Sequence, residues 1–356
     1  MKHIQIVLFD GFDLLDALAP YEVFYAAAMY ADDAIHVELV TAEGPRHVTS
    51  GTNGLRIEAT GTLNPEQADI ILVPGASGKV EGDGPDTVPA ILNRAMQTGL
   101  TSRVEKALKQ PDTIVVTVCG GSLLLAMGGL LEGRSAVTHH MGMEVLGATG
   151  AMPVQARVVD DGNLITGGGV TSGLDVALYM VERELGPRIA HAVEQLFEYE
   201  RRGTAWRNTG MPPVQSAPSE EKRDMHEPAV TAQQAAINQE PAATVPQEAM
   251  NKEPAPAASF VGEWDTTLAT PVGKLQVRLS IATSNGIIRG KAVQGDETVE
   301  FIDPILNDNK LMWSLRITKP MRLNLRFEVE ADGNRMSGVA KAGILPASKL
   351  AGERIS

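Results

Sequence analysis

The first 209 residues alternate short apolar runs with longer stretches of helical periodicity, and this alternation constrains the fold more than any other feature. Apolar runs rich in β-branched side chains predict buried strands at residues 4–9, 36–41, 70–74, 113–118 and 163–166. Helical patterns lie between them, at residues 21–30, 88–109, 122–131 and 173–185. Strand, helix and strand in repetition predict a three-layer α/β sandwich with helices on both faces of a mostly parallel sheet.

The character of the sequence changes twice after residue 209, which predicts three segments: 1–209, 210–258 and 259–356. Residues 210–258 hold eight of the 21 prolines and no aromatic residue, so they cannot bury enough apolar surface to offset their ordering entropy. We interpret this Pro/Ala/Glu-rich stretch as a linker. Residues 259–356 alternate apolar and polar side chains between regularly spaced turn signals, which predicts about eight antiparallel strands in a small all-β barrel.

The chain has a net charge of −13, and its acidity lies in the first 258 residues, which hold 18 basic and 33 acidic residues against 13 and 11 in residues 259–356. Such acidity opposes contact with phosphate backbones, so we expect no nucleic-acid partner. No run approaches the roughly 18–20 apolar residues that a membrane span needs, so we expect no membrane partner either. Cys119 is the only cysteine, which excludes an intramolecular disulfide and favours a reducing, cytoplasmic location.

Cys119 lies where a β-branched strand runs directly into a helix. Gly120 and Gly121 follow it, and an apolar helical pattern begins at once. This arrangement is typical of a nucleophile elbow, in which small neighbours allow the nucleophile a strained backbone. The helix N-terminus beneath the sulfur would favour the thiolate. Although free cysteines are most often small buried hydrophobes, the two glycines favour a catalytic role here.

Two residues are candidates for handling protons beside this sulfur. Asp16 lies in an otherwise apolar segment, where burial would raise its pKa towards a useful range, but it equally fits a cap for the helix expected near Pro20. His139 is the second candidate, and it also fits a structural role. Its neighbour His140 would point to the opposite face of a strand, and no further ligand stands at metal spacing. We therefore expect neither a metal nor a cofactor.

Two glycine-rich turns complete the predicted site. The amides of Gly75 and Ala76 follow a buried strand, and together with the amide of Gly120 they are candidates for an anion hole. Residues 167–173 lack the acidic partner of a dinucleotide fingerprint, so close backbone packing against the elbow explains them better.

Five motifs in order make residues 1–209 resemble the ThiJ/PfpI superfamily, whose fold is flavodoxin-like and of the class I glutamine-amidotransferase type. They lie at residues 15–20, 73–75, 118–122, 136–139 and 166–175. Protease-like and chaperone-like members carry His after the cysteine, where this chain has Gly120, so the resemblance is to the isonitrile hydratase branch. That branch usually has Thr at this place and a second Gly where this chain has Ala76.

The resemblance implies a homodimeric lyase that hydrates an isonitrile, a small-molecule substrate, to an N-substituted formamide. Cys119 would form a thioimidate, with Asp16 as its proton partner. A glyoxalase, deglycase or amidase using the same cysteine is an alternative, and a redox or metabolite sensor is a non-catalytic one. Residues 260–265 resemble the opening strand of calycin-like barrels, although Trp264 also fits a plain core aromatic.

Overall fold

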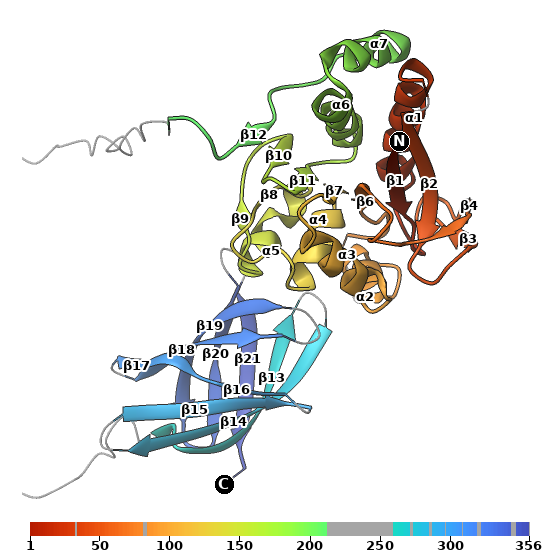
Figure 1. Ribbon diagram of the computed structural model, residues 1–356. Coiled ribbons are helices and arrows are strands. Elements are labelled where there is room, and N and C mark those ends of the chain that lie inside the picture. Colours follow the sequence, from red (N-terminus) through yellow and green to blue (C-terminus); the bar gives the residue numbers. More distant parts are fainter. Residues whose placement is uncertain are drawn as a thin grey trace, which may run out of the picture. The chain divides into compact units, whose positions relative to one another are not determined.

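The computed structural model describes residues 1–32, 34–80, 84–211, 259–270, 273–284, 287–295, 297–307, 309–318, 322–342 and 347–355. They form an α/β part and a β part (Figure 1). The predicted linker, residues 210–258, lies outside the described residues except for its first two positions. The boundaries of the three predicted segments therefore stay predictions.

An eight-stranded sheet forms the centre of the α/β part, in the order β12-β10-β11-β7-β6-β1-β2-β5. All its neighbouring strands are parallel except β10 and β11. Strands β6, β7 and β11 are buried along their whole length, as expected for parallel strands covered on both faces. The strands are β1 (Lys2–Val7), β2 (Ile35–Thr41), β5 (Gly61–Thr62), β6 (Ile70–Val73), β7 (Ile114–Val118), β10 (Val158–Asp160), β11 (Leu164–Gly167) and β12 (Trp206–Arg207).

Helices lie on both sides of this sheet, which confirms the predicted α/β sandwich (Figure 1). One side carries α1 (Leu14–Tyr30), α6 (Ser172–Leu185) and α7 (Pro187–Phe197), which pack on one another. The other carries α2 (Val88–Met96), α3 (Leu100–Leu108), α4 (Gly121–Met127) and α5 (Met143–Ala148). The smaller elements are the pair β3 (Arg46–Thr49) and β4 (Arg56–Ala59), the pair β8 (Ser135–Ala136) and β9 (Met152–Pro153), and the 3₁₀ helix η1 (His140–Gly142).

Three predicted helix boundaries were wrong, each for a local reason. Helix α1 begins at Leu14 rather than at residue 21, because the Asp13 side chain caps it and Pro20 is accommodated inside the helix. The predicted helix at 88–109 is two helices, since Gly99 lies at the break between α2 and α3. Helix α4 ends at Met127, because two glycines follow it and Gly129 has a positive φ of 82°.

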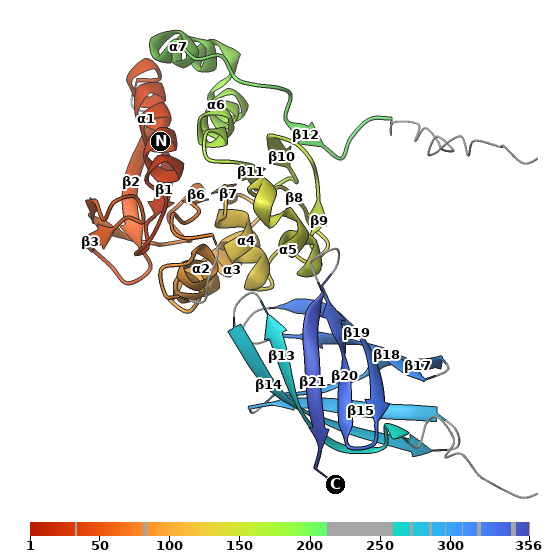
Figure 2. The same ribbon diagram turned by 180° about the vertical axis from the view of Figure 1, so that it is seen from behind.

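The β part is a nine-stranded antiparallel sheet that curls into a nearly closed barrel (Figure 2). Its strand order is β16-β15-β14-β13-β21-β20-β19-β18-β17, one strand more than predicted. Closure leaves few unpaired backbone groups at the edges. The strands are β13 (Gly262–Thr270), β14 (Gly273–Ser284), β15 (Ile287–Gln294), β16 (Glu297–Glu300), β17 (Ile302–Asn307), β18 (Lys310–Ile317), β19 (Leu323–Asp332), β20 (Arg335–Lys341) and β21 (Ser348–Arg354).

Aromatic side chains fill the interior of this barrel. Trp264 is fully buried, its Nε1 donates to the Phe260 carbonyl at 2.9 Å, and the Arg354 guanidinium lies 4.3 Å from its ring centroid. Trp313 is stacked between Phe301 and Phe327, with ring centroids 4.4 and 4.9 Å apart. Trp264 therefore links the first strand of the barrel to its last, in addition to serving as a core aromatic.

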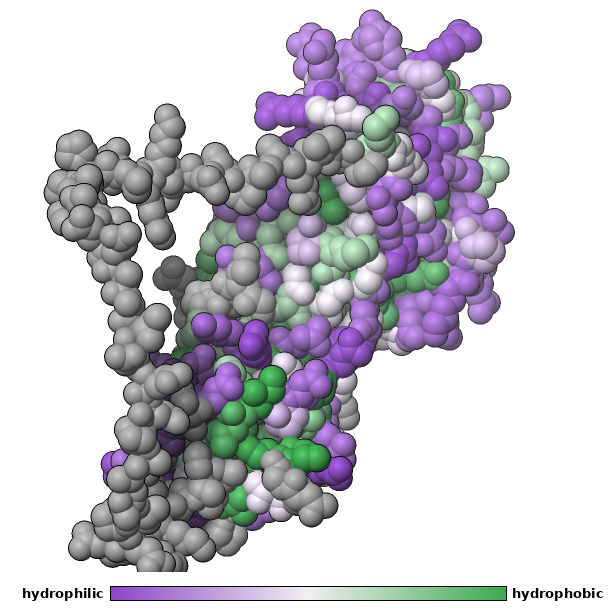
Figure 3. All heavy atoms as spheres, turned by 90° about the vertical axis from the view of Figure 1, so that its left-hand side faces the viewer, coloured by the Kyte–Doolittle hydropathy of each residue, from purple (hydrophilic) through white to green (hydrophobic). Residues whose placement is uncertain are grey.

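One face of the molecule differs in surface character between the two parts (Figure 3). On the face shown in Figure 3, hydrophilic side chains cover most of the α/β part and an apolar patch lies on the β part. Exposed isoleucines of the β part include Ile287, Ile302 and Ile305.

Within the described residues no helix has both the length and the apolar character that a membrane span requires.

Candidate functional site

Cys119 follows the carboxyl end of β7 and precedes α4 in a strained turn. Its φ of +54° lies in the left-handed region that residues other than glycine seldom adopt. Neighbouring elements hold this backbone: the Cys119 N–H donates to the Gly167 carbonyl at 3.0 Å, and the Cys119 carbonyl accepts from Thr138 Oγ1 at 2.7 Å. The strand, cysteine and helix thus form the sharp turn expected from the sequence, with glycine-rich residues 167–173 packed beside it.

Asp16 lies on the first turn of α1, and its side chain is completely buried. Its Oδ2 accepts the Gly75 N–H at 2.9 Å. Its Oδ1 is also buried, and no hydrogen-bond partner for it exists in the part of the chain that the structure describes. Because Asp13 caps α1, the alternative that Asp16 is a helix cap is wrong. A buried carboxyl oxygen without a partner is available to a bound molecule.

The pKa values of Asp16 and Cys119 are both raised. Burial raises the pKa of Asp16 to about 8, the nearby Asp13 charge adds to the rise, and contacts with the Gly75 N–H and the Cys119 thiol oppose it. Burial likewise raises the pKa of the Cys119 thiol well above its usual range, and the Asp16 charge raises it further. The Gly120 N–H acts in the opposite direction. Lost hydration thus outweighs the helix N-terminus, and this disfavours the thiolate expected from the sequence.

The three candidate anion-hole amides differ in what they contact. The Gly75 N–H is already bonded to Asp16, so it orients the carboxyl group. The Gly120 N–H faces the sulfur of Cys119. The Ala76 N–H has no acceptor among the described residues. A Cβ at Gly75 would lie 2.5 Å from the Gly120 nitrogen, so glycine is needed where the two turns meet.

His139 lies at the start of η1 and outside the Cys119–Asp16 pair. Its Nδ1 accepts the Met141 N–H at 3.4 Å, and its ring centroid is 4.3 Å from that of His140. Burial and then the neighbouring His140 lower the pKa of His139, which favours a neutral imidazole. Across the described ranges, no hydrogen bond or ion pair joins His139 to Cys119 or Asp16.

Sequence comparison decides the family. A sequence model of the DJ-1/PfpI family matches residues 2–183, which include the elbow, Asp16 and His139. The chain belongs to the DJ-1/PfpI family. The resemblance to this superfamily that the five motifs predicted is confirmed, and so is the fold that it implied for residues 1–209.

Proteins similar to this chain include an enzyme and transcriptional regulators. The isonitrile hydratase of Pseudomonas putida is 36% identical over 200 residues, which are 55% of this chain and 78% of that protein. The HTH-type transcriptional regulator CdhR of Pseudomonas aeruginosa is 26% identical over 200 residues, 54% of this chain and 53% of the regulator. A solved ThiJ/PfpI family protein from Pseudomonas syringae has 26% identity and a TM-score of 0.47, covering 57% of this chain and 76% of that one.

Two residues that contribute to this site were not identified from the sequence. Asp13 caps α1 through the N–H groups of Leu15 and Asp16, at 3.0 and 3.3 Å, and raises the pKa of Asp16. An aspartate directly before a helical pattern with another acid three residues later was the available signal. Thr138 supports the Cys119 carbonyl, but this contact joins segments whose approach depends on the tertiary fold.

The approach to Cys119 is narrow, since this residue is only 7% exposed. A cleft of about 710 Å³ begins at Ser77, directly after the Ala76 turn, and extends to Arg94. A second cleft, of about 660 Å³, surrounds Asp175 and Arg201 away from the elbow. Cys119 lines neither of them. Little of Cys119 is therefore open to a reacting group.

Proposed function

We propose that this DJ-1/PfpI protein hydrates an isonitrile to an N-substituted formamide, with Cys119 as nucleophile and Asp16 as proton carrier. The observation that carries the proposal is the fully buried carboxyl group of Asp16, which lies beside the Cys119 thiol with Oδ1 unpaired. The similarity to the Pseudomonas putida isonitrile hydratase, at 36% identity, supports the same reaction class.

In the first step, the Cys119 sulfur bonds to the terminal carbon of the isonitrile. The thiol proton passes to the Asp16 carboxylate and from there to the same carbon, which gives a thioimidate in which carbon carries sulfur, hydrogen and doubly bonded nitrogen. A pKa of about 8 allows Asp16 to accept and release this proton near neutral pH. The reactive form of the pair therefore holds one proton.

In the second step, water adds to the thioimidate carbon. Asp16 takes a proton from this water and passes it to the substrate nitrogen as the carbon becomes tetrahedral. The carbon–sulfur bond then breaks while the new hydroxyl group gives its proton, by way of Asp16, to the sulfur, which releases the formamide and restores the thiol. The amides of Gly120 and Ala76 are proposed to stabilise charge on the substrate during these changes, whereas the Gly75 amide keeps Asp16 in place.

The narrow approach to Cys119 favours an isonitrile over a carbonyl substrate. The reacting carbon of an isonitrile is terminal and has only nitrogen behind it, so it suits a cysteine residue that is 7% exposed. The carbonyl carbon of an amide carries substituents on two sides and needs a wider approach. Methylglyoxal and simple amides are therefore expected to be poorer substrates than an isonitrile.

The test is turnover of cyclohexyl isocyanide, with the formamide product followed by chromatography. Cys119→Ala and Asp16→Asn are each expected to lower kcat/KM by at least about 100-fold, the lower range for losing a nucleophile or an acid/base group. His139→Asn is the matched control, because His139 makes no bond to the pair. Absence of formamide from wild type, while iodoacetamide still alkylates Cys119, would overturn the proposal.

A non-catalytic sensor is the second candidate. Two observations favour it: Cys119 is buried and its pKa is raised, and regulators occur among the relatives. If wild type, Cys119→Ala and Asp16→Asn all leave isonitriles, α-oxoaldehydes and amides unconverted while one of these compounds still binds, the sensor function replaces the enzymatic one.

A further inference from the structure

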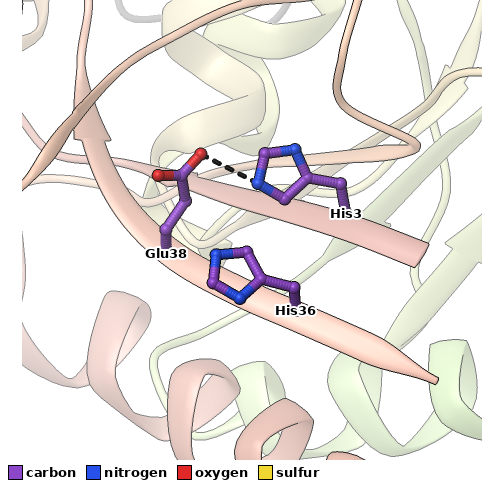
Figure 4. A group of neighbouring side chains, drawn as sticks. All are labelled: His3, His36 and Glu38. Atoms are coloured by element: carbon purple, nitrogen blue, oxygen red, sulfur yellow. Dashed lines mark ion pairs between the residues drawn. The ribbon is translucent and has the colours of Figure 1, made fainter. Parts of the chain in front are cut away.

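Three polar side chains gather on β1 and β2, away from the elbow. Figure 4 shows the imidazole rings of His3 and His36 and the carboxylate of Glu38 on these neighbouring strands. One potential ligand atom from each residue lies within 4.8 Å of those from the other two. The strands are parallel and His3 is the register partner of His36, so these groups lie near the amino ends of the strands. Cys119 follows the carboxyl end of β7, at the opposite edge of the sheet.

The alternation of β1 explains why these side chains share one face. Ile4 and Ile6 are completely buried and point to one face of the sheet, so His3 and Gln5 point to the other. On β2, His36 and Glu38 are two residues apart and lie opposite His3 and Gln5 in the register. The side chains of His3 and Glu38 are 27% and 21% exposed, which leaves the cluster accessible from solvent.

The contacts of His3 fix which of its nitrogens can bind a cation. Its Nδ1 lies 3.3 Å from the Gln67 carbonyl, and because a carbonyl only accepts, Nδ1 carries a hydrogen. In the neutral ring, Nε2 then presents a lone pair, and it faces Glu38 Oε1 at 3.0 Å. A ligating histidine commonly gives its other N–H to a backbone carbonyl in this way.

Glu38 is oriented by a buried amide. Gln5 is 1% exposed, and its Nε2 donates to Glu38 Oε1 at 2.7 Å. Its own Oε1 accepts the Asn64 N–H at 2.8 Å, which determines which end of the amide faces the carboxylate. The carboxylate thus receives a hydrogen bond from an outer group that is itself held in place, as metal-ligating carboxylates do.

We propose that His3, His36 and Glu38 bind one Zn²⁺, with water in the fourth position. Zinc–nitrogen and zinc–oxygen bonds of about 2.1 Å in a tetrahedron place ligand atoms about 3.4 Å apart. The 3.0 Å contact of His3 with Glu38 is already near this spacing, and a ring nitrogen of the exposed His36 lies within 4.8 Å of both ligand atoms. Two imidazoles favour zinc over magnesium or calcium, which prefer oxygen ligands alone.

This proposal differs from the expectation of no metal site, which rested on His139 and His140. Sequence spacing did not indicate the cluster, because its two histidines lie on separate strands that become neighbours only in the folded sheet. The ring centroids of His3 and His36 are 5.1 Å apart, so pairing of β1 with β2 brings both imidazoles to one place.

The test is a zinc titration of the full chain, without any polyhistidine tag, against a chromophoric chelator. Wild type is expected to bind one equivalent. His36→Ala and Glu38→Gln are each expected to raise the Kd of this equivalent at least about 10-fold. Two controls are expected to keep it: His47→Ala, which removes an exposed histidine on β3, and Cys119→Ala, which removes the one thiol.

Measurements of Tm and circular dichroism distinguish loss of zinc binding from misfolding of the variants. Zinc is expected to raise the Tm of wild type and of both controls but not that of His36→Ala or Glu38→Gln, whose far-UV circular dichroism should match wild type. Absence of a zinc equivalent in wild type, or an unchanged Kd in both cluster variants, would overturn the proposal. Loss of the equivalent only in Cys119→Ala would also overturn it, and would place zinc at the elbow.

Discussion

Asp16 combines a chemical advantage with a stability penalty. Its buried carboxyl group is suited to carrying a proton near neutral pH because burial raises its pKa to about 8. In the unfolded chain an aspartate loses its proton near pH 4. Between about pH 4 and 8, the folded protein therefore holds a proton that the unfolded chain has released, and its stability falls as the pH rises through this window.

Replacement of the Asp16 carboxyl group by an amide removes this pH-dependent loss of stability. Asp16→Asn is expected to raise the free energy of unfolding more at pH 8 than at pH 4, with an upper limit of about 5 kcal/mol. Urea denaturation of both proteins at the two pH values measures this difference. The exposed Asp112→Asn is the control, and it is expected to show no such pH dependence. An equal effect of Asp16→Asn at both pH values would contradict the raised pKa.

At the scale of elements, the aspartate before α1 has both a structural and an electrostatic role. Asp13 caps the helix, and its charge raises the pKa of Asp16. Asparagine caps a helix about as well as aspartate but carries no charge, so Asp13→Asn separates the two roles.

Turnover should rise with pH as the Cys119–Asp16 pair loses its first proton, at about pH 8. Asp13→Asn is expected to shift this rise to lower pH, because a negative charge that opposes ionisation of Asp16 has gone. A pH profile of kcat/KM measures the shift, and the Tm at acidic pH checks that the cap is kept. A shift to higher pH would exclude this electrostatic role for Asp13.

The junction of β6 with α4 depends on one glycine of the elbow. A Cβ at Gly121 would lie 2.1 Å from the Val73 carbonyl oxygen, whereas one at Gly120 would meet nothing nearer than 3.5 Å. Gly121→Ala is expected to destabilise the protein by about 3 kcal/mol, and Gly120→Ala by less than about 1 kcal/mol. Chemical denaturation of the two variants compares them directly. Equal losses of stability would mean that the two turns adjust more freely than their backbone contacts indicate.

At the scale of the whole molecule, the groups of the proposed active site all come from the α/β part. The groups that form or contact the Cys119–Asp16 pair lie between Asp13 and Gly167 in the sequence. A chain of residues 1–211 is therefore expected to keep kcat/KM for cyclohexyl isocyanide within about two-fold of the full chain, as for a domain with its own core. Loss of turnover by a truncated chain with native circular dichroism would assign the β part a role in catalysis.

The fold was predictable wherever one local pattern decided it. Strands β6 and β7 are continuous apolar runs because helices cover both of their faces, and the barrel strands alternate because one face is buried. Helix ends were less predictable, since Asp13 and Pro20 offer two competing starts for α1 and the capping bonds decide between them. The raised pKa of Cys119 was not predictable, because burial outweighs the helix N-terminus only in the assembled core.

The sequence by itself determined the alternation of strands and helices, the turn that holds Cys119, and the family to which the chain belongs, because each rests on residues adjacent in the chain. The tertiary structure alone decided which distant groups meet. The order β7-β6-β1-β2 brings Asp16 and Gly75 to Cys119 at one edge of the sheet, and His3, His36 and Glu38 together near the other. Strand order results from long-range packing, which no local pattern encodes.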